Sequence, residues 1–358
     1  EVNPLFSDSV YIDRLSRIPA VMEMPYNDIV RKFIDMYAGR LRNQVSFMLS
    51  ACNFYMPIFE EALDAYGLPL ELKYLPIIES ALNPSAVSRA GASGLWQFMI
   101  GTGKIYGLES NSLIDERRDP IKATWAAARY LKEMYDIYGD WNLVIAAYNC
   151  GPGTINKAIR RAGGETDYWK IYNLLPKETR GYVPAFIAAN YVMTYYCDHN
   201  ICPMETNIPA STDTVQVTQN LHFEQIAELC NVPLDEVKSL NPQYKKQIIP
   251  GTTKPCTLRL PQGAISAFID KQDTIYAHRA DELFRNRKTV AVKEITPATR
   301  RQTSAIAGKG KLTYYKIKSG DTLSSIAEKL GVRVRDIQQW NGMSNTRISA
   351  GKQLKIYK

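Results

Sequence analysis

The sequence has few residues of the kinds that bind metals, and it has no segment long enough to cross a membrane. It contains three histidines and six cysteines in 358 residues, and none of the cysteines forms the paired CxxC spacing of a zinc site. We therefore expect neither a metal nor a cofactor. No run of eighteen apolar residues occurs, which excludes a transmembrane helix within the chain. The chain begins at Glu1 and not at a methionine, so any membrane anchoring is expected through a segment not present in it.

Acidic residues become scarce toward the C-terminus. The net charge is +8, yet residues 285–311 carry eight Lys or Arg against Glu294 alone, and residues 312–358 carry nine against three acidic residues. A basic tail on an acidic body indicates tethering to a polyanion. The cell envelope and nucleic acid are the two candidates. The aromatic-plus-basic patterns of nucleic-acid modules are missing, so we expect no nucleic-acid partner.

Strand-like alternation is nearly absent from the first two hundred residues. Apolar residues recur at helical spacing from Asn27 onward. The pair Asp119-Pro120 predicts a helix start with proline at the first helical position, and Gly139-Asp140 predicts its end. Further helices are expected over 141–149 and 182–196. Residues 1–204 therefore form one predicted all-α domain, with a core from about 68 to 200.

The stretch from Leu72 to Met99 organises this domain. Its apolar spacing predicts a helix that Asn83-Pro84 ends, then a glycine-bearing turn, then a second helix that opens with Leu95-Trp96-Gln97. Glu79 falls in the last turn of the first helix, among apolar neighbours. Both the apolar surroundings and the helix dipole at that end raise a carboxyl pKa, which suits a general acid near neutral pH. The alternative is an ordinary solvated surface glutamate.

Further motifs follow Glu79 in a fixed order. They are Ser88, then GASGLWQFM at 91–99, AAYNCGPG at 146–153 and ETRGYV at 178–183. In this order and spacing the set resembles the lytic transglycosylase domain, which has a goose-lysozyme-like fold, over about residues 68–197. The GLWQFM motif followed by TGKIYGL is most similar to the membrane-bound murein transglycosylase D branch.

The resemblance assigns roles to residues of this chain. Glu79 is the expected catalytic residue, and Tyr148 is expected to hydrogen-bond it. Substrate contacts are expected from Asn149 on the sugar and from Ser88, Gln97 and Tyr182 along the groove. The alternative to a role in the site is a position in the core for Tyr148 and a packing role for Gln97.

The C-terminal residues predict a small βααβ module. The expected elements are a strand at 314–317, a turn at Ser319-Gly320-Asp321 with Asp321 as N-cap, helices at 322–330 and 334–340, and a strand at 354–357. With GDTLSSIA as its signature, residues 312–358 resemble a LysM module of the peptidoglycan- and chitin-binding kind. The expected glycan-binding residues are Gly320, Asp321, Thr322 and Asn341.

A weaker copy of this module lies at residues 211–262. Seven residues from Phe223 to Asn241 match the later copy at a constant offset of 100 positions. Gln219-Asn220-Leu221 replaces the Ser-Gly-Asp turn, so we expect the fold without assured sugar binding. Residues 263–311 are expected to be a basic linker, partly helical. The expected disulfides are Cys197 with Cys202 and Cys230 with Cys256, and free thiols are the alternative.

The fold class is therefore predicted as mainly α, with a lysozyme-like catalytic domain and two βααβ LysM modules. No second acid is assigned, because Asp115, Glu116 and Asp119 read as a solvated loop before a helix. The resemblance then implies a peptidoglycan lytic transglycosylase that leaves 1,6-anhydromuramoyl ends. A hydrolytic muramidase and a non-catalytic wall-binding protein are the alternatives. We expect a monomer in the periplasm or cell envelope, bound to glycan strands and associated with the outer membrane if an anchor precedes it.

Overall fold

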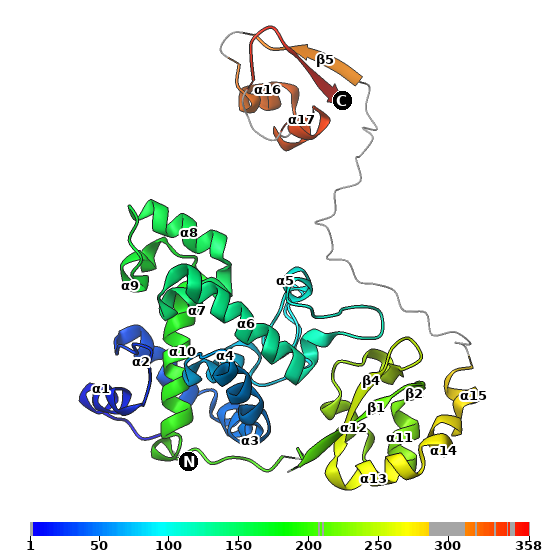
Figure 1. Ribbon diagram of the computed structural model, residues 1–358. Helices are drawn as coiled ribbons and strands as arrows, with labels where there is room; N and C mark the ends of the chain where they lie inside the picture. The colour runs from blue at the N-terminus through cyan, green and yellow to red at the C-terminus, as the bar shows by residue number, and fades with distance from the viewer. Residues whose placement is uncertain are drawn as a thin grey trace. The chain divides into compact units, whose positions relative to one another are not determined.

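The computed structural model describes residues 3–206, 208–209, 211–285, 312–318, 321–332, 334–341, 343 and 348–357. The chain divides into two compact units, Glu1–Ile295 and Thr296–Lys358. Figure 1 shows the helical domain and the first small module, both in the first unit, and the second small module in the other. The predicted fold class, mainly α with two small strand-containing modules, is confirmed.

The first two hundred residues are helical, and several helices start at side-chain caps. With η for a 3₁₀ helix, the elements are α1 (Asp8–Arg17), α2 (Asp28–Ala38), α3 (Arg42–Ala65), η1 (Leu70–Tyr74), α4 (Leu75–Ser80), α5 (Ile100–Ile105), η2 (Glu116–Arg118), α6 (Pro120–Tyr138), α7 (Trp141–Cys150), α8 (Pro152–Arg161), α9 (Tyr168–Ile171), η3 (Tyr172–Leu174), α10 (Lys177–Tyr195) and η4 (Cys197–His199). Asn27, Asp119 and Asp140 accept hydrogen bonds from the first backbone N–H groups of α2, α6 and α7. Gly139, at φ 62°, ends α6 as predicted.

Helix α10 lies at the centre of the helical domain. It packs against α2, α4 and α7, and its residues from Tyr182 to Met193 are all buried (Figure 1). Gly181 permits the close approach of α2, because a Cβ there would lie 3.1 Å from the Phe33 ring. This packing brings α4, which carries Glu79, against α10, which is distant in sequence.

The stretch from 72 to 105 differs from its prediction in three ways. The first helix divides into η1 and α4, since Pro76 stands in the first turn of α4. Helix α4 ends at Ser80, because Ala81 and Leu82 take left-handed φ values of 51° and 59°. The second helix begins at Ile100 and not at Leu95, because residues 94–97 form a turn.

Asp115 and Glu116 are a fourth correction. The loop that holds them was expected to be solvated, yet their exposed fractions are 2% and 5%. Each is paired with a cation, Asp115 with Arg117 and Glu116 with Lys122. A buried carboxylate needs such a partner, and sequence position alone did not reveal it.

The first small module forms the second part of unit 1. Its elements are β1 (Thr212–Val217), β2 (Asn220–His222), α11 (Phe223–Cys230), α12 (Leu234–Leu240), η5 (Lys245–Gln247), β3 (Ile248–Pro250), β4 (Cys256–Pro261), α13 (Gln262–Asp270), α14 (Gln272–Ala277) and α15 (Ala280–Leu283). Strand β1 pairs antiparallel with β4, and β2 with β3. Phe268 and Ile275 are buried in the same core as β1 and α11. The helices expected in a linker therefore pack onto the module.

The second module matches its predicted order of elements. It consists of β5 (Leu312–Lys316), α16 (Leu323–Leu330), α17 (Val334–Trp340) and β6 (Gln353–Tyr357), with β5 antiparallel to β6. The N-cap of α16 is Thr322 and not Asp321, since Thr322 Oγ1 accepts from the Ser325 N–H. Asp321 instead accepts from the Lys318 N–H and the Tyr315 hydroxyl.

All six cysteines are free thiols in this structure, so the two expected disulfides are not formed. Cys230 and Cys256 are both buried, but their surroundings differ. The Cys256 thiol donates to the Lys254 carbonyl and lies near Tyr244, whereas the charged group near the Cys230 thiol is Lys271. Cys197 and Cys202 are exposed and both lie close to the Tyr196 hydroxyl.

Candidate active site

Glu79 lies one residue before the end of α4, beside the loop that carries Gln97. The Ser80 hydroxyl is within 3.0 Å of two carbonyl oxygens, those of Pro76 and Leu95. The first closes the last turn of α4 and the second ties that turn to the 93–98 loop. The left-handed pair Ala81-Leu82 then turns the chain away, so Glu79 faces a pocket at the helix end.

A pocket of about 470 Å³ brings Glu79 together with Ser88 and Gln97. Its lining residues come from α2 and α3, the end of α4, and the 86–97 loop. They are Met36, Tyr37, Leu41, Gln44, Met48, Ile77, Ile78, Glu79, Ser80, Ala81, Ala86, Val87, Ser88 and Gln97. Three of these residues, Glu79, Ser88 and Gln97, are predicted from the sequence motifs, whereas the wall from α2 and α3 is not. Their helical periodicity predicted helices, not which face would meet Glu79.

Burial controls the proton affinity of Glu79. Desolvation of the carboxyl group raises its pKa to about 7, a hydrogen bond from Tyr182 partly opposes this, and the charge of Glu178 adds to the increase. Near neutral pH the carboxyl group is therefore present in both its protonated and its ionised form. Such a group can give a proton and later take one, which is what a single acid–base residue needs.

Tyr182, not Tyr148, donates a hydrogen bond to Glu79. Tyr182 lies in the second turn of α10, and its hydroxyl donates to Glu79 Oε1. The expected bond from Tyr148 is wrong, because that hydroxyl donates to the Trp96 carbonyl at 2.6 Å. Tyr148 still lies close to Glu79. Burial raises the pKa of the Tyr148 hydroxyl, and the charge of Glu79 adds to that increase. The sequence placed both tyrosines near the site and could not tell which hydroxyl reaches the carboxylate.

Gln97 and Ser88 are held by contacts within their own loop. Gln97 takes a left-handed φ of 47°, and its side-chain amide donates to the carbonyls of Gly94 and Ala86 at 2.8 and 3.2 Å. The exposed Ser88 hydroxyl accepts from the Ala92 N–H at 3.1 Å. Trp96, in the same turn, is fully buried and donates to Thr124 Oγ1 at 2.9 Å. Trp96 is therefore a residue of the core.

Asn149 stands at the end of α7 and is linked to α10. Its Oδ1 accepts from Thr179 Oγ1 at 2.9 Å, which leaves its amide nitrogen for other partners. Glu178, next to Thr179, belongs to the ETRGYV motif, but nothing in the sequence assigns it as a second catalytic acid. The structure brings it near enough to affect the pKa of Glu79. Glu178 stands at the start of α10, and no pattern in the sequence predicts that this helix end lies near Glu79.

The proposed glycan-binding residues of the second module have structural contacts in this structure. Asn341 donates to the Ile337 and Lys355 carbonyls and accepts from the Lys355 N–H, so it joins α17 to β6. Thr322 caps the start of α16, and Asp321 accepts from the Lys318 N–H in the turn before it. Gly320 lies outside the described residues. Glycan binding by these residues stays a prediction.

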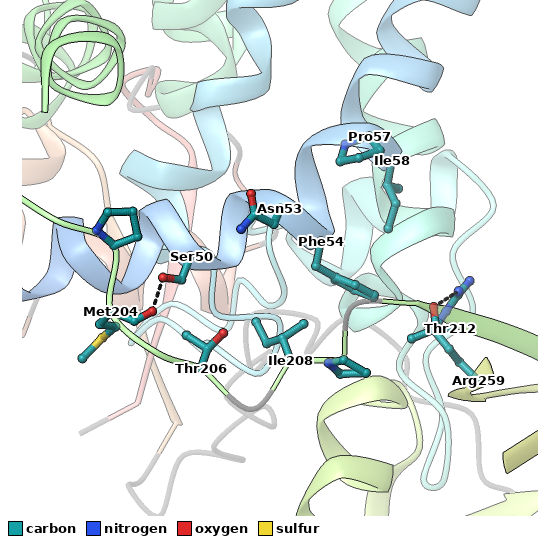
Figure 2. Close-up of a pocket in the computed structure, with 12 residues that line it drawn as sticks. Ser50, Asn53, Phe54, Pro57, Ile58, Met204, Thr206, Ile208, Thr212 and Arg259 are labelled. Carbon is teal, nitrogen blue, oxygen red and sulfur yellow. Dashed lines mark hydrogen bonds between the residues drawn. The ribbon is translucent and has the colours of Figure 1, made fainter. Parts of the chain in front are cut away.

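A second cavity, of about 610 Å³, lies between α3 and the segment that leads to β1 (Figure 2). Phe54 and Ile58 of α3 form one side, and Arg259 of β4 reaches it with a hydrogen bond to Thr212. No carboxylic acid is among its described lining residues. The cavity therefore offers no acid–base chemistry, and the pocket at Glu79 is the candidate active site.

Three families match successive parts of the chain. The Transglycosylase SLT domain matches residues 56–171, the Lytic transglycosylase MltD, LysM-like domain matches residues 211–277, and the LysM domain matches residues 315–356. The order is the one expected from the motifs. The resemblance to a lytic transglycosylase domain followed by LysM modules is confirmed.

Two curated proteins of Escherichia coli (strain K12) show how far the likeness extends. The soluble lytic murein transglycosylase is 33% identical over 124 residues, which cover 33% of this chain and 19% of that protein. The crystal structure of the 70 kDa soluble lytic transglycosylase from Escherichia coli is 28% identical over 42% of this chain and 26% of that chain, with a TM-score of 0.35. The membrane-bound lytic murein transglycosylase D is 30% identical over 341 residues, which cover 94% of this chain and 70% of that protein. With nearly its whole length matched, this chain belongs to the family of the membrane-bound lytic murein transglycosylase D.

Proposed function

We propose that this protein cleaves the β-1,4 bond between N-acetylmuramic acid and N-acetylglucosamine in peptidoglycan, without water, and leaves 1,6-anhydromuramoyl ends. The observation that carries the proposal is the raised pKa of Glu79 and its position in the pocket. Its pKa is about 7, and among the described residues it is the single carboxylic acid that lines the pocket. Family membership supplies the substrate class, and the pocket supplies the acid–base group.

In the proposed mechanism Glu79 acts twice. The protonated carboxyl group donates its proton to the glycosidic oxygen, and the bond from that oxygen to the muramoyl anomeric carbon breaks. The acetamido group of the substrate stabilises the positive charge that develops at this carbon. The Glu79 carboxylate then accepts the proton of the muramoyl 6-hydroxyl, whose oxygen bonds to the anomeric carbon. General acid–base assistance of this kind contributes roughly 10² to 10⁴ in rate.

Tyr182 supports the second half of this sequence. Its hydroxyl donates to Glu79, which stabilises the carboxylate relative to the acid and so lowers the pKa against the effect of burial. Ser88, Gln97, Tyr148 and Asn149 are proposed as substrate-binding residues. Gln97 and Ser88 line the same pocket as Glu79, whereas Tyr148 acts through the Trp96 carbonyl next to Gln97.

Hydrolysis is the second candidate function, and Glu178 is the observation that favours it. Two-carboxylate glycosidases place their acids about 5–5.5 Å or about 6.5–9.5 Å apart, and the second acid activates water or attacks the sugar. Glu178 is exposed on α10, one helical turn before Tyr182, and its charge acts on Glu79. An exposed carboxylate that does not line the pocket is a poorer base than Glu79 itself.

The C-terminal module is proposed to hold the enzyme on peptidoglycan. It matches the LysM domain and adds basic residues to an acidic body. Family membership supports a location in the cell envelope. A periplasmic position at the outer membrane and a monomeric state are part of the proposal. No helix within the described residues is both long and apolar enough to cross a membrane.

Mass spectrometry of a peptidoglycan digest tests the proposal. The parent chain should release muropeptides with 1,6-anhydromuramoyl ends, and Glu79→Gln should abolish turnover because the amide keeps the shape and cannot transfer the proton. Glu178→Gln is the matched control and should keep the anhydro product at a similar rate. Reducing ends in place of anhydro ends would establish the hydrolytic alternative. Equal loss in both variants would show that two carboxylates act.

A further inference from the structure

The loop at residues 109–118 joins the two parts of unit 1. Within it Ser110 and Asp115 are bridged as a short antiparallel pair. Asn111 Oδ1 accepts from the Leu113 and Ile114 N–H groups at 2.8 and 2.7 Å, which fixes the tip of the loop. The chain therefore presents a rigid projection at this position and not a solvated connection.

The tip of the 109–118 loop is part of the core of the first module. Leu113 and Ile114 are buried, at 3% and 4% exposed, in the same apolar cluster as Val217 and Phe223. Backbone bonds fix this contact: the Asp115 N–H donates to the Gln243 carbonyl at 2.8 Å, and the Lys245 N–H donates to the Leu113 carbonyl at 2.7 Å. The module thus holds the loop through backbone hydrogen bonds and through buried side chains.

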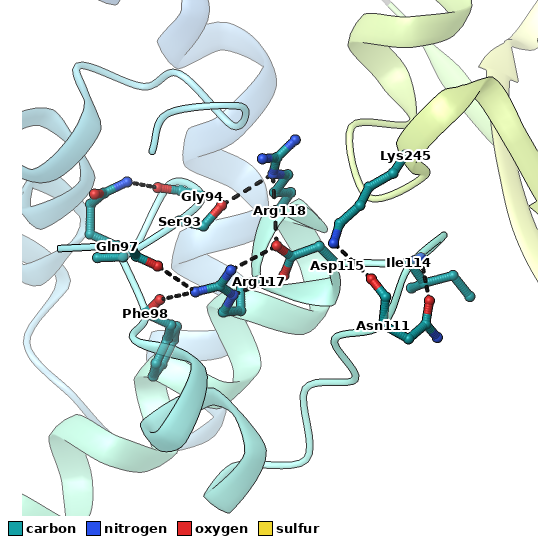
Figure 3. A network of polar contacts seen from close by, with 12 residues as sticks. Ser93, Gly94, Gln97, Phe98, Asn111, Ile114, Asp115, Arg117, Arg118 and Lys245 are labelled. Atoms are coloured by element: carbon teal, nitrogen blue, oxygen red, sulfur yellow. Dashed lines mark hydrogen bonds and ion pairs between the residues drawn. The ribbon is translucent and has the colours of Figure 1, made fainter. Parts of the chain in front are cut away.

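The base of the same loop holds the segment that carries Gln97. Arg117 Nη1 donates to the Gly91 carbonyl at 2.8 Å and to the Phe98 carbonyl at 2.9 Å, at the two ends of that segment. Figure 3 shows Arg117 between Phe98 and Asp115. Its Nε and Nη2 donate to the two carboxylate oxygens of Asp115 at 2.8 Å each. Both side chains are almost fully buried, at 6% and 2% exposed. Such a paired, desolvated guanidinium has one geometry available to it.

Gly94 shows how closely the two loops fit. A Cβ at position 94 would lie 1.8 Å from the Arg117 carbonyl oxygen, so no other residue fits there. Arg118 adds a bond to Ser93 Oγ at 3.1 Å. Between Ser93 and Phe98, which are bridged, Gln97 takes its left-handed φ. The position of Gln97 in the pocket therefore depends on Arg117 and its partner Asp115.

The first module is also closed on another side by its own helices. Gln225 of α11 donates to the Tyr276 and His278 carbonyls at 3.1 and 2.7 Å, and Phe268 and Ile275 are buried beneath. In the second copy the residue at the matching position is Ser325, and its bonds to described residues lie within its own turn, with Thr322. In the first copy this face of α11 is therefore covered by helices that follow it in the same chain.

We infer that the first LysM-like module is a brace for the active site, which it supports through the 109–118 loop, and that Arg117 is a positioning residue for Gln97. This rests on the proposed function for its effect on cleavage. The module clamps the tip of the loop, Asp115 fixes the guanidinium, and Arg117 fixes the two ends of the Gln97 segment.

Full-length Asp115→Asn and Lys254→Met test the inference as a matched pair. The asparagine keeps the shape and the backbone bond to Gln243 and removes the charge that orients Arg117. Lys254 pairs with Glu109 and Glu116 of the same loop. Its replacement leaves in place the buried loop tip, the two backbone bonds to the module and the Asp115–Arg117 pair. Arg117→Lys is the second variant, because an ammonium keeps the charge and cannot span the same four acceptors.

Two readouts separate the brace from the proposed function. Amide hydrogen exchange of residues 88–99, read by mass spectrometry, should rise at least about tenfold for Asp115→Asn and Arg117→Lys and stay at the parent value for Lys254→Met. With short soluble glycans, KM should rise and kcat/KM fall about tenfold in the first two variants, with the pH profile unshifted because Arg117 does not bond Glu79. Exchange and kcat/KM within twofold of the parent in both variants would overturn the inference. A parent chain that gives no anhydro product would defeat the proposed function alone, since the exchange readout is independent of it.

Discussion

The two LysM copies have the same fold and opposite relations to the rest of the chain. The first copy lies in one unit with the helical domain and receives Leu113 and Ile114 into its core. The second copy belongs to a separate unit with its own small core around Ile326 and Ile337. The difference shows that a repeated module is free to be a structural part in one copy and an attached domain in the other. Sequence similarity between copies is not evidence of a shared role.

One side chain has been kept in both copies for a structural reason. Asn241 donates to the Val237 and Arg259 carbonyls and accepts from the Arg259 N–H. Asn341 makes the same three bonds with Ile337 and Lys355. The shared asparagine therefore ties the second helix to the last strand. These bonds explain why asparagine occurs in both copies at an offset of 100 positions, without a role in sugar binding.

The largest expected effect comes from removing the second copy. Truncation after residue 311 should reduce retention on insoluble peptidoglycan at least about tenfold, or 1.4 kcal/mol. Cleavage of short soluble glycans should change less than about twofold, because that copy lies outside the unit that holds Glu79. A pull-down with isolated sacculi and a soluble-glycan assay on the same preparation measure both. Equal retention by the truncated chain would mean that the first copy also binds the wall.

The matched asparagines should give a smaller effect that differs between the copies. Asn241 is fully buried, so Asn241→Ala leaves backbone groups of Arg259 unpaired, at about 1–3 kcal/mol for such groups. Asn341 is partly exposed and water can replace its bonds, so Asn341→Ala should cost about 1 kcal/mol. Hydrogen exchange of β4 and of β6 reports each copy separately. Equal losses would contradict the expectation that the difference in burial between the two asparagines decides the cost.

The sequence was sufficient for the elements and the order of the domains, because these follow from local patterns. Asp119-Pro120 and Gly139 marked α6 correctly, and the strands and helices of the second copy fell within one or two residues. It was not sufficient where a long-range contact decides the conformation. The turn at 94–97 replaces an expected helix because Arg117, some twenty residues later, packs its backbone against Gly94.

The candidate site shows the same limit. Motif order brought Glu79, Ser88 and Gln97 to one pocket, and they do lie together. Which tyrosine bonds Glu79 depends on the depth at which α10 crosses α4, and no pattern along the chain encodes that depth. The expectation of a solvated loop at Asp115 and Glu116 was wrong for a related reason, since charged residues in a loop look the same in sequence whether solvent or another domain covers them.

The smallest expected effect distinguishes the two tyrosines of the active site, with retention by the second copy as the common control. The acid step needs protonated Glu79, so the parent kcat/KM should fall as pH rises through about 7. The Tyr182 bond lowers the Glu79 pKa, so its loss in Tyr182→Phe should raise that pKa. The fall in kcat/KM should then move to higher pH by about one to two pH units, as for the loss of a bond to a charged group. Tyr148→Phe loses a bond to a neutral carbonyl, about 1 kcal/mol, so its rate should drop about fivefold with the fall in place. Both variants should stay on sacculi as the parent does, because neither residue is in the second copy. A shift in Tyr148→Phe with none in Tyr182→Phe would return Glu79 to the partner first expected for it.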